Sequence, residues 1–388
     1  MPSWLPLLLG FLTAINPVST DMYLPAFPAI ESSLGTASGA AQLTLATWFL
    51  GLAVGQITQG TLSDRFGRRG PLLVGTALYT VASVGCALST DLVTLSAFRF
   101  VAAFGASASS VIPRAIVRDV ADGLAAARVM SRLMLVMGVA PILAPTLGGF
   151  LLGVASWRAI FWVTTAYGVV SMLLVWRFLP DTLPVQMRMR LGFTGLLSRY
   201  VDVATDRAFI TNVVMGAFVL FVLFAYLSGA PEVFIAGFGL DPQRFAILFG
   251  LNAAGFIAVS QINPRLVARF GPHRVIRWGV FLSALAVLVL VFNAVLGLGG
   301  MLGIFLPIMA STAAGTLVLP NAAVAALSRH ASRAGSASAL MGTLQFSIAA
   351  LATLLVGLFS DGTARPMALT MLIGVAGALC MHWLRPKR

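Results

Sequence analysis

The stretch GTLSDRFGRRG, residues 60–70, joins two long apolar segments through a short and strongly basic loop. Gly60 has no side chain, so it allows two helices to approach closely, and Gly67 permits the tight turn that a two-helix hairpin needs. Asp64 can pair with Arg65, with Arg68 or with a neighbouring helix end. The string therefore predicts a helical hairpin whose loop carries a charge latch.

A related string, PRLVARFGPH, occupies residues 264–273. It repeats a leucine, an arginine, a phenylalanine and a glycine of the first string, but Ala268 stands at the position of Asp64. Duplicated halves with a site between them are typical of secondary transporters. We expect a six-helix bundle over residues 1–180, a cytoplasmic linker over 181–207 and a second six-helix bundle over 208–388. The linker is expected to be a solvated tether, with a short amphipathic helix as the alternative.

The composition predicts a membrane protein. Of the 388 residues, 59% are hydrophobic and only 10% are charged, which is too apolar for a soluble chain. Segments of about 20 apolar residues recur, and each is long enough to cross a bilayer. They lie near 5–28, 40–63, 71–90, 92–116, 129–153, 157–179, 208–230, 244–268, 275–296, 299–325, 335–359 and 364–384. The alternating pattern of a membrane β-barrel is absent, so we expect an all-α polytopic protein with twelve transmembrane helices.

The net charge of +13 follows the predicted topology. Most of the arginines fall in alternate loops, and the loops between them keep only Arg158, Arg244 and Arg365. By the positive-inside rule, both termini are expected in the cytoplasm. The charge is therefore a topology signal, and no nucleic-acid partner is expected.

The loop string resembles the signature between the second and third helices of the major facilitator superfamily. The matching positions are Gly60, Leu62, Ser63, Asp64, Arg65, Gly67, Arg68 and Arg69. The resemblance implies the major facilitator fold, with two six-helix bundles, and it makes residues 60–69 a candidate cytoplasmic gate.

The stretch LSAFRFVAAFGASA, residues 95–108, places Arg99 within the fourth span. An arginine in hydrocarbon must face a cavity or a partner, because burying its charge is costly. The stretch resembles the arginine motif of the family's fourth helix, although Ala102 and Ala103 replace the usual glutamine and glycine. The alternative is an arginine that extends to the membrane interface.

The stretch APILAPTLGGF, residues 140–150, resembles the fifth-helix motif that marks antiporters of this superfamily. Pro145, Gly148 and Gly149 match that motif. Proline bends a helix and small residues let backbones meet, which suits a hinge or a seal against ion leakage. Plain tight helix packing is the alternative.

The stretch NPVSTDMYLPAFP, residues 16–28, carries Asp21 inside the first span, flanked by Pro17 and Pro25. Together with QLTL (42–45), RAIVRDV (114–120) and SWRAIF (156–161), it resembles the drug:proton antiporters of the bicyclomycin and chloramphenicol resistance group. The resemblance implies that Asp21 binds the coupled proton or a cation and that Arg99 biases its pKa. The alternative is an acid near the outer interface, and Glu232 is either a second acid or a loop charge.

The expected function is proton-coupled efflux of drug-like small molecules across the bacterial inner membrane by alternating access, carried out by a monomer. The alternatives are a symporter or a sugar or metabolite exporter on the same fold, and a polytopic membrane enzyme. No ATP-binding string, metal pattern or cofactor pattern occurs in the sequence, and enzymatic activity is not expected. Candidate residues of the substrate pocket are Tyr23, Trp48, Phe49, Asn212, Phe224, Tyr226, Asn252, Asn321 and Gln345.

Overall fold

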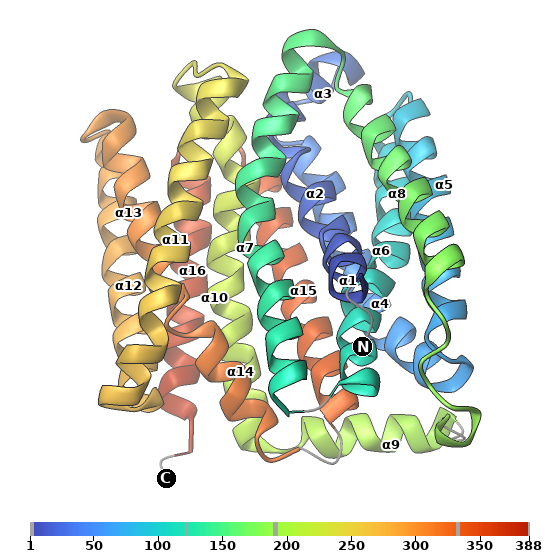
Figure 1. Ribbon diagram of the computed structural model, residues 1–388. Coiled ribbons are helices and arrows are strands. Elements are labelled where there is room, and N and C mark those ends of the chain that lie inside the picture. Colours follow the sequence, from blue (N-terminus) through green and yellow to red (C-terminus); the bar gives the residue numbers. More distant parts are fainter. Residues whose placement is uncertain (1–3, 122, 189–192, 331–333, 387–388) are drawn as a thin grey trace.

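The computed structural model describes residues 4–121, 123–188, 193–330 and 334–386, and every regular element in these ranges is a helix (Figure 1). The first part of the chain forms α1 (Leu5–Thr13), α2 (Ile15–Asp21), η1 (Leu24–Ala26), α3 (Phe27–Leu34), α4 (Ala41–Phe66), α5 (Arg69–Leu88), α6 (Leu92–Val120), α7 (Gly123–Val154) and α8 (Arg158–Phe178). A connecting segment follows, with η2 (Val185–Met187) and α9 (Phe193–Ala204). The last part forms α10 (Arg207–Pro231), η3 (Glu232–Gly237), α11 (Pro242–Phe270), α12 (Pro272–Leu296), α13 (Gly300–Gly315), α14 (Leu319–Leu327), α15 (Ala334–Leu358) and α16 (Arg365–Leu384).

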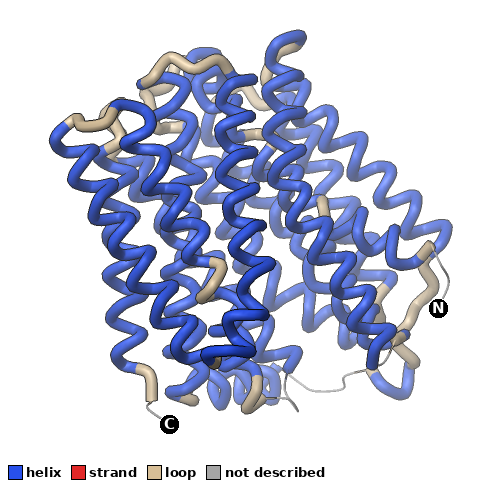
Figure 2. The backbone as a smooth tube through the Cα atoms, turned by 60° about the vertical axis from the view of Figure 1, so that its left-hand side comes forward, coloured by secondary structure: helices blue, strands red, loops and turns tan. Residues whose placement is uncertain are grey.

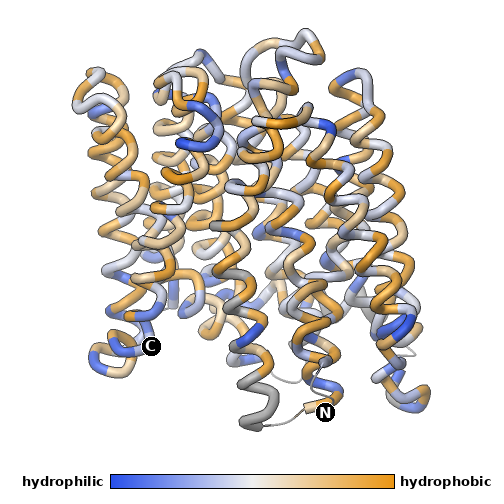
Figure 3. Tube along the Cα trace, turned by 45° about the horizontal axis from the view of Figure 1, so that its top comes forward, coloured by the Kyte–Doolittle hydropathy of each residue, from blue (hydrophilic) through white to orange (hydrophobic). Residues whose placement is uncertain are grey.

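The helices have the length and composition of membrane spans. Ten helical stretches of the described chain are long and apolar enough to cross a bilayer. Two more long helices, α4 with 26 residues and α7 with 32, complete the twelve that the sequence predicts. Buried polar side chains, including Gln42, Gln56 and Gln59, make α4 less apolar than its neighbours. Hydrophobic residues cover most of the helix lengths in Figure 3. The predicted all-α membrane fold is confirmed.

The first span is broken at two places, and its prolines explain both. Proline has no backbone N–H, so the carbonyl four residues before it loses its helical hydrogen bond. Pro17 leaves the carbonyl of Thr13 free, and α1 ends at Thr13. Pro25 does the same for Asp21, and α2 ends at Asp21. A single 3₁₀ turn then leads into α3, so the chain around Asp21 is the least regular part of this span.

Two long contacts join the first part of the chain to the last. Helix α4 packs against α15, and α7 packs against α11. Figure 2 shows the long helices running side by side, joined by short loops at both ends of the bundle. The hydroxyl of Thr343 donates to the backbone carbonyl of Ala53 at 2.8 Å across the first contact. A Cβ atom at Gly149 would lie only 2.8 Å from the carbonyl oxygen of Pro242 across the second. These two contacts join the parts of the chain before and after the connecting segment.

Helix α9 gives the molecule a reference direction. It lies across one end of the bundle (Figure 1), and we call this the α9 end. The opposite end, here called the far end, carries the connections over residues 35–40 and 359–364. The connecting segment therefore contains a helix within 181–207, which was the alternative to a plain tether.

Candidate functional site

Asp21 is the last residue of α2, at the second break in the first span. Its side chain is 6% exposed, so the carboxylate lies in the protein interior. Tyr226 of α10 lies close enough for electrostatic coupling to Asp21. The Tyr226 hydroxyl is buried and makes no hydrogen bond within the part of the chain that the structure describes. The break thus places a buried acid within electrostatic range of a hydroxyl from the last part of the chain.

The glycines of α7 bring that helix against the same break. A Cβ atom at Gly148 would overlap the carbonyl oxygen of Met22, so α7 touches the backbone directly beside Asp21. Gly149 faces the start of α11 instead, and Pro145 is buried. Two adjacent glycines therefore let one helix touch the first span on one side and the last part of the chain on the other.

Arg99 is buried, with 2% of its surface exposed, and it does not extend to an interface. Its Nη1 atom donates to the backbone carbonyl of Ser19 at 3.0 Å. Its guanidinium carbon lies 4.5 Å from the ring centre of Tyr23 and 4.3 Å from that of Trp48. Aromatic faces attract a cation, so this cage offsets part of the burial cost.

No ion pair between Arg99 and Asp21 occurs among the described residues, so the two predicted coupling residues are not paired in this conformation. Arg99 turns instead toward the backbone of α2, through Ser19, which precedes Asp21 by two residues. Any influence of Arg99 on Asp21 acts over a distance or through that backbone. The Nε and Nη2 atoms of Arg99 are buried without a hydrogen bond within the described ranges.

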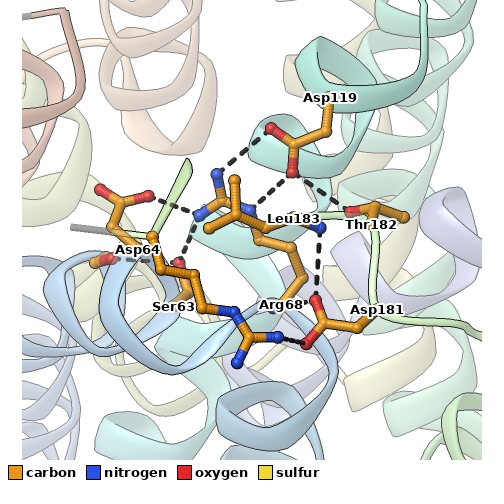
Figure 4. A network of polar contacts seen from close by, with 9 residues as sticks. Ser63, Asp64, Arg68, Asp119, Asp181, Thr182 and Leu183 are labelled. Atoms are coloured by element: carbon orange, nitrogen blue, oxygen red, sulfur yellow. Dashed lines mark hydrogen bonds and ion pairs between the residues drawn. The ribbon is translucent and has the colours of Figure 1, made fainter. Parts of the chain in front are cut away.

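The loop of residues 60–70 is organised by Arg68 (Figure 4). Its guanidinium donates to both oxygens of Asp119 on α6, at 2.7 and 3.2 Å, and to Asp64 at 2.5 Å. The backbone N–H of Arg68 donates to Asp181 at 2.9 Å. Burial alone would lower the pKa of Arg68, but the hydrogen bonds and charges of Asp119 and Asp64 raise it. Of the partners expected for Asp64, Arg68 is the one that pairs with it.

The two glycines of this loop differ in the space around them, and its other arginines contact a carbonyl or an aromatic ring. Gly67 has φ +92°, and a Cβ atom there would overlap the carboxylate of Asp181, so only glycine fits this turn. Gly60 is different, because a Cβ atom would meet Val111 at an ordinary 3.6 Å. The expectation that Gly60 permits a close helix approach is therefore wrong for this conformation. Arg69 donates to the carbonyl of Trp176 at 2.6 Å, and Arg65 lies 5.5 Å from the ring centre of Phe66.

A second carboxylate closes the far end. Glu232, at the end of α10, is 7% exposed. It accepts hydrogen bonds from Ser38 at 3.0 Å and from Gln42 at 3.3 Å, both before or within α4. It also accepts from the hydroxyl of Ser360 and from the backbone N–H of Gly362 at 3.0 Å, in the connection between α15 and α16. Glu232 is therefore not a free loop charge, because it joins the first part of the chain to the last.

The backbones meet closely beside Glu232. A Cβ atom at Gly39 would lie 2.7 Å from the carbonyl oxygen of Gly357. A Cβ atom at Gly357 would lie 2.9 Å from the carbonyl oxygen of Gly39 and 2.9 Å from Cβ of Gln42. Two glycines thus permit a backbone contact at the far end that no other residue pair would allow.

The α9 end is hollow. A cavity of about 530 Å³ lies there, bounded by α1, α2, α4, α6 and α7 from the first part of the chain, by α9, and by α14 and α15 from the last part. Asn16, Gln56, Arg114, Arg118 and Gln345 are among its polar lining residues. Asp21 does not line this cavity. The structure is therefore closed at the far end and open at the α9 end.

The nine candidate pocket residues do not share one cavity. Gln345 lines the cavity at the α9 end, while Asn212 and Asn321 line another of about 440 Å³ between the ends of α10, α11, α12 and α14. The other six are packed in the interior. Tyr23 and Trp48 surround Arg99, Phe49 packs on Phe224, Tyr226 lies near Asp21, and Asn252 accepts a hydrogen bond from Thr312. Their role in substrate binding stays a prediction.

Sequence reasoning offered Asp64 as a partner of Arg68 but did not find the other partners of Arg68 or any partner of Glu232. Asp119 and Asp181 hold Arg68, and Gln42 and Ser360 hold Glu232. Asp119 lies within a string that resembles the antiporter group, which was the one available signal. Within the described ranges, no group of three His, Cys, Asp or Glu side chains could hold a metal ion.

Comparisons with known proteins agree with this geometry. The model of the Major Facilitator Superfamily matches residues 9–353. The chain is 35% identical to an uncharacterized MFS-type transporter, YdgK, of Bacillus subtilis, over 99% of this chain and 96% of the relative. It is 29% identical to a bicyclomycin resistance protein homolog of Haemophilus influenzae, over 94% and 92% of the two chains. It is 28% identical to a chloramphenicol resistance protein of Pseudomonas aeruginosa, over 98% and 91%. The predicted resemblance to the bicyclomycin and chloramphenicol resistance group is confirmed.

A solved structure has the same fold. The partially occluded, inward-open xylose transporter XylE of E. coli superposes with a TM-score of 0.77, covering 99% of this chain and 98% of that chain. The sequence identity is 15%, so the likeness is one of fold alone.

Proposed function

Because the chain belongs to the major facilitator superfamily, and is therefore a multi-pass membrane transporter rather than an enzyme, we propose that it exports drug-like small molecules in exchange for protons. The membrane is the bacterial inner membrane. Two relatives similar over nearly the whole chain are named for resistance to bicyclomycin and to chloramphenicol, which supports drug-like substrates. No specific feature of the described residues favours a sugar exporter or a symporter.

The observation that carries the proposal is the position of Asp21. A carboxylate that is 6% exposed and has no cation paired with it among the described residues is costly in its ionised form. Such a group favours a bound proton when it is enclosed and releases it when water or a substrate dipole reaches it. The broken helix and the Tyr226 hydroxyl provide polar groups that can accommodate both forms. Asp21 is thus the proton-coupling residue of the proposed exchange.

Alternating access follows from the two ends of the molecule. The α9 end carries the arginine-rich loops, so by the positive-inside rule it faces the cytoplasm, together with both termini. The structure then represents an inward-facing state, with Glu232 and the glycine contact closing the outer side. We propose that residues 1–180 and 208–388 move as two bundles and that residues 181–207 link them. The Arg68 cluster ties α4, α6 and the start of that linker into one unit.

Transport by purified protein in liposomes tests the proposal. The pH gradient alone is varied, with the membrane potential clamped, and movement of chloramphenicol is followed. Proton antiport predicts accumulation against its concentration gradient only while the pH gradient exists, and loss of accumulation with Asp21→Asn. Asp91→Asn is the matched control, because Asp91 is an exposed acid that caps α6. Accumulation that ignores the pH gradient would contradict the proposal.

A further inference from the structure

Cations outnumber anions on the described wall of the cavity at the α9 end. Its charged lining residues among those described are Arg114, Arg118 and Asp64. Asp64 is held in an ion pair with Arg68, a partner that it shares with Asp119. Arg114 and Arg118 lie one helical turn apart on α6, and both side chains are exposed to the cavity. Like charges at this spacing destabilise a helix, so an anion between them would be stabilising.

Neither arginine has a carboxylate partner within the described chain. Asp119 is next to Arg118 in sequence, but its two oxygens accept from Arg68 and from Thr182. Three other arginines of the described chain, Arg188, Arg244 and Arg329, do pair with an aspartate. The pair on α6 therefore holds free guanidinium donors over an open cavity.

Topology alone does not explain Arg114. Arginines that set orientation belong at helix ends, whereas Arg114 precedes the end of α6 at Val120 by six residues. At 1.5 Å per residue this is about 9 Å inside the helix. Its side chain also faces the space between the two parts of the chain rather than the outer surface.

The neighbouring groups complete a site for an anion with an apolar body. Gln56 and Ser110 hydrogen-bond to each other at 3.0 Å on the cavity wall. Met130, Met341 and Phe346 supply apolar surface. Guanidinium groups bind carboxylate, sulfonate and phosphate oxygens through paired hydrogen bonds. We propose that this cavity is the entry site for substrates that carry one such anionic group on an aromatic or aliphatic body.

This inference rests on the proposed export function and names its substrate class. It also changes the part assigned to Asp21, which does not line the cavity and so serves the proton rather than a drug cation. Proton and substrate then occupy separate sites, and the change of access state couples them. Coupling between separate sites is reciprocal, so substrate binding still alters proton binding.

Binding and transport of three probes test the inference. Fluorescein is anionic at neutral pH, ethidium is cationic and chloramphenicol is neutral. Wild-type protein should bind fluorescein in a fluorescence anisotropy titration, and the variant R114Q/R118Q should bind it at least tenfold more weakly. Its chloramphenicol transport should fall much less than its fluorescein binding, because a neutral substrate makes no ion pair with the two arginines. R114K/R118K keeps both charges and should recover most of the fluorescein affinity. Arg269→Gln, at the exposed end of α11, is the matched control.

The possible results separate this inference from the proposed function. Ethidium bound more tightly than fluorescein by the wild type would overturn the anion site, even where pH-driven chloramphenicol transport persists. Equal loss of all three probes in R114Q/R118Q would also overturn it, since the arginines would then be structural. Displacement of fluorescein by inorganic phosphate as effectively as by benzoate would assign the pair to small free anions and overturn the substrate class. Failure of pH-driven transport alone would refute the exchange function while anisotropy still reports on the anion site.

Discussion

The glycine contact at the far end predicts that one methyl group will change the access state. Gly357 belongs to α15 and touches the connection before α4, which comes from the other part of the chain. The contact exists only while the far end is closed. Gly357→Ala should therefore favour a conformation that is open at the far end.

The magnitude follows from the contact distances. The new Cβ would lie 2.9 Å from the carbonyl oxygen of Gly39, which is backbone and yields little. Overpacking of this kind costs about 1–3 kcal/mol. At about 1.4 kcal/mol per tenfold change, the ratio of open to closed far ends should rise by roughly 5- to 150-fold. Alanine is also a better helix former than glycine by about 1 kcal/mol, so weakening of α15 cannot be the cause.

Spin labels at Ser33 and Leu298 measure this ratio. Both positions are exposed, and they lie at the far end on the first and last parts of the chain. Cys86 and Cys380 are replaced by serine first, because they are the two native cysteines. Double electron–electron resonance in lipid nanodiscs should show a larger population at long distance for Gly357→Ala. Gly216→Ala is the control, because the nearest atom to its new Cβ lies at 3.7 Å.

An unchanged distance distribution in Gly357→Ala would refute this reasoning. It would mean that the glycine contact does not limit closure. A change of equal size in Gly216→Ala would also refute it, because the effect would then come from any helical glycine.

Three further predictions concern other contacts. Asp64→Asn should slow transport severalfold with little change in substrate affinity, because it weakens the cluster around Arg68, and a liposome assay at wild-type rate would contradict this. Gly148→Leu should block the approach of α7 to the first span and so change which end of the molecule is open. Labelling of single cysteines placed at the α9 end and at the far end measures this, and labelling rates equal to those of the wild type would count against it. Asp206→Ala should lower detergent stability by about 1–2 kcal/mol at neutral pH, because Asp206 caps α10. Burial opposes ionisation of Asp206, but hydrogen bonds from Ala208 and His330 lower its pKa, so this loss should persist above pH ~4 and vanish as the pH falls through the lowered pKa.

Features that depend on neighbouring residues in the chain could be predicted from the sequence. The twelve long helices follow from apolar segments of membrane length, and the breaks in the first span follow from Pro17 and Pro25 through the hydrogen bonds they remove. The positive φ of Gly67 is likewise a local demand. The sequence thus predicts an acid at a helix break, which is the most distinctive feature of the interior.

Long-range partners could not be predicted in the same way. Asp64 had two arginines within reach in sequence, Arg65 and Arg68, yet Arg68 also binds Asp119, which α6 brings to it. From the sequence, Glu232 was equally well interpreted as a second acid of the interior or as a loop charge. In the structure, Ser38 and Ser360 donate hydrogen bonds to it from distant parts of the chain. Arg99 was expected to bias the pKa of Asp21, and its guanidinium lies over the rings of Tyr23 and Trp48. Each of these outcomes depends on how helices pack, which spacing along one chain does not specify.

The central claim is that Asp21 carries the exchanged proton, and proton release on substrate binding tests it most directly. Purified protein in detergent and weak buffer is mixed with saturating chloramphenicol, and the change in pH is read from a soluble indicator dye. Wild-type protein and the control Asp91→Asn should release protons with the same stoichiometry near neutral pH. Asp21→Asn should release none while still binding chloramphenicol, since the amide mimics the protonated acid. Undiminished proton release from Asp21→Asn would contradict the account and would make Glu232 the next acid to examine.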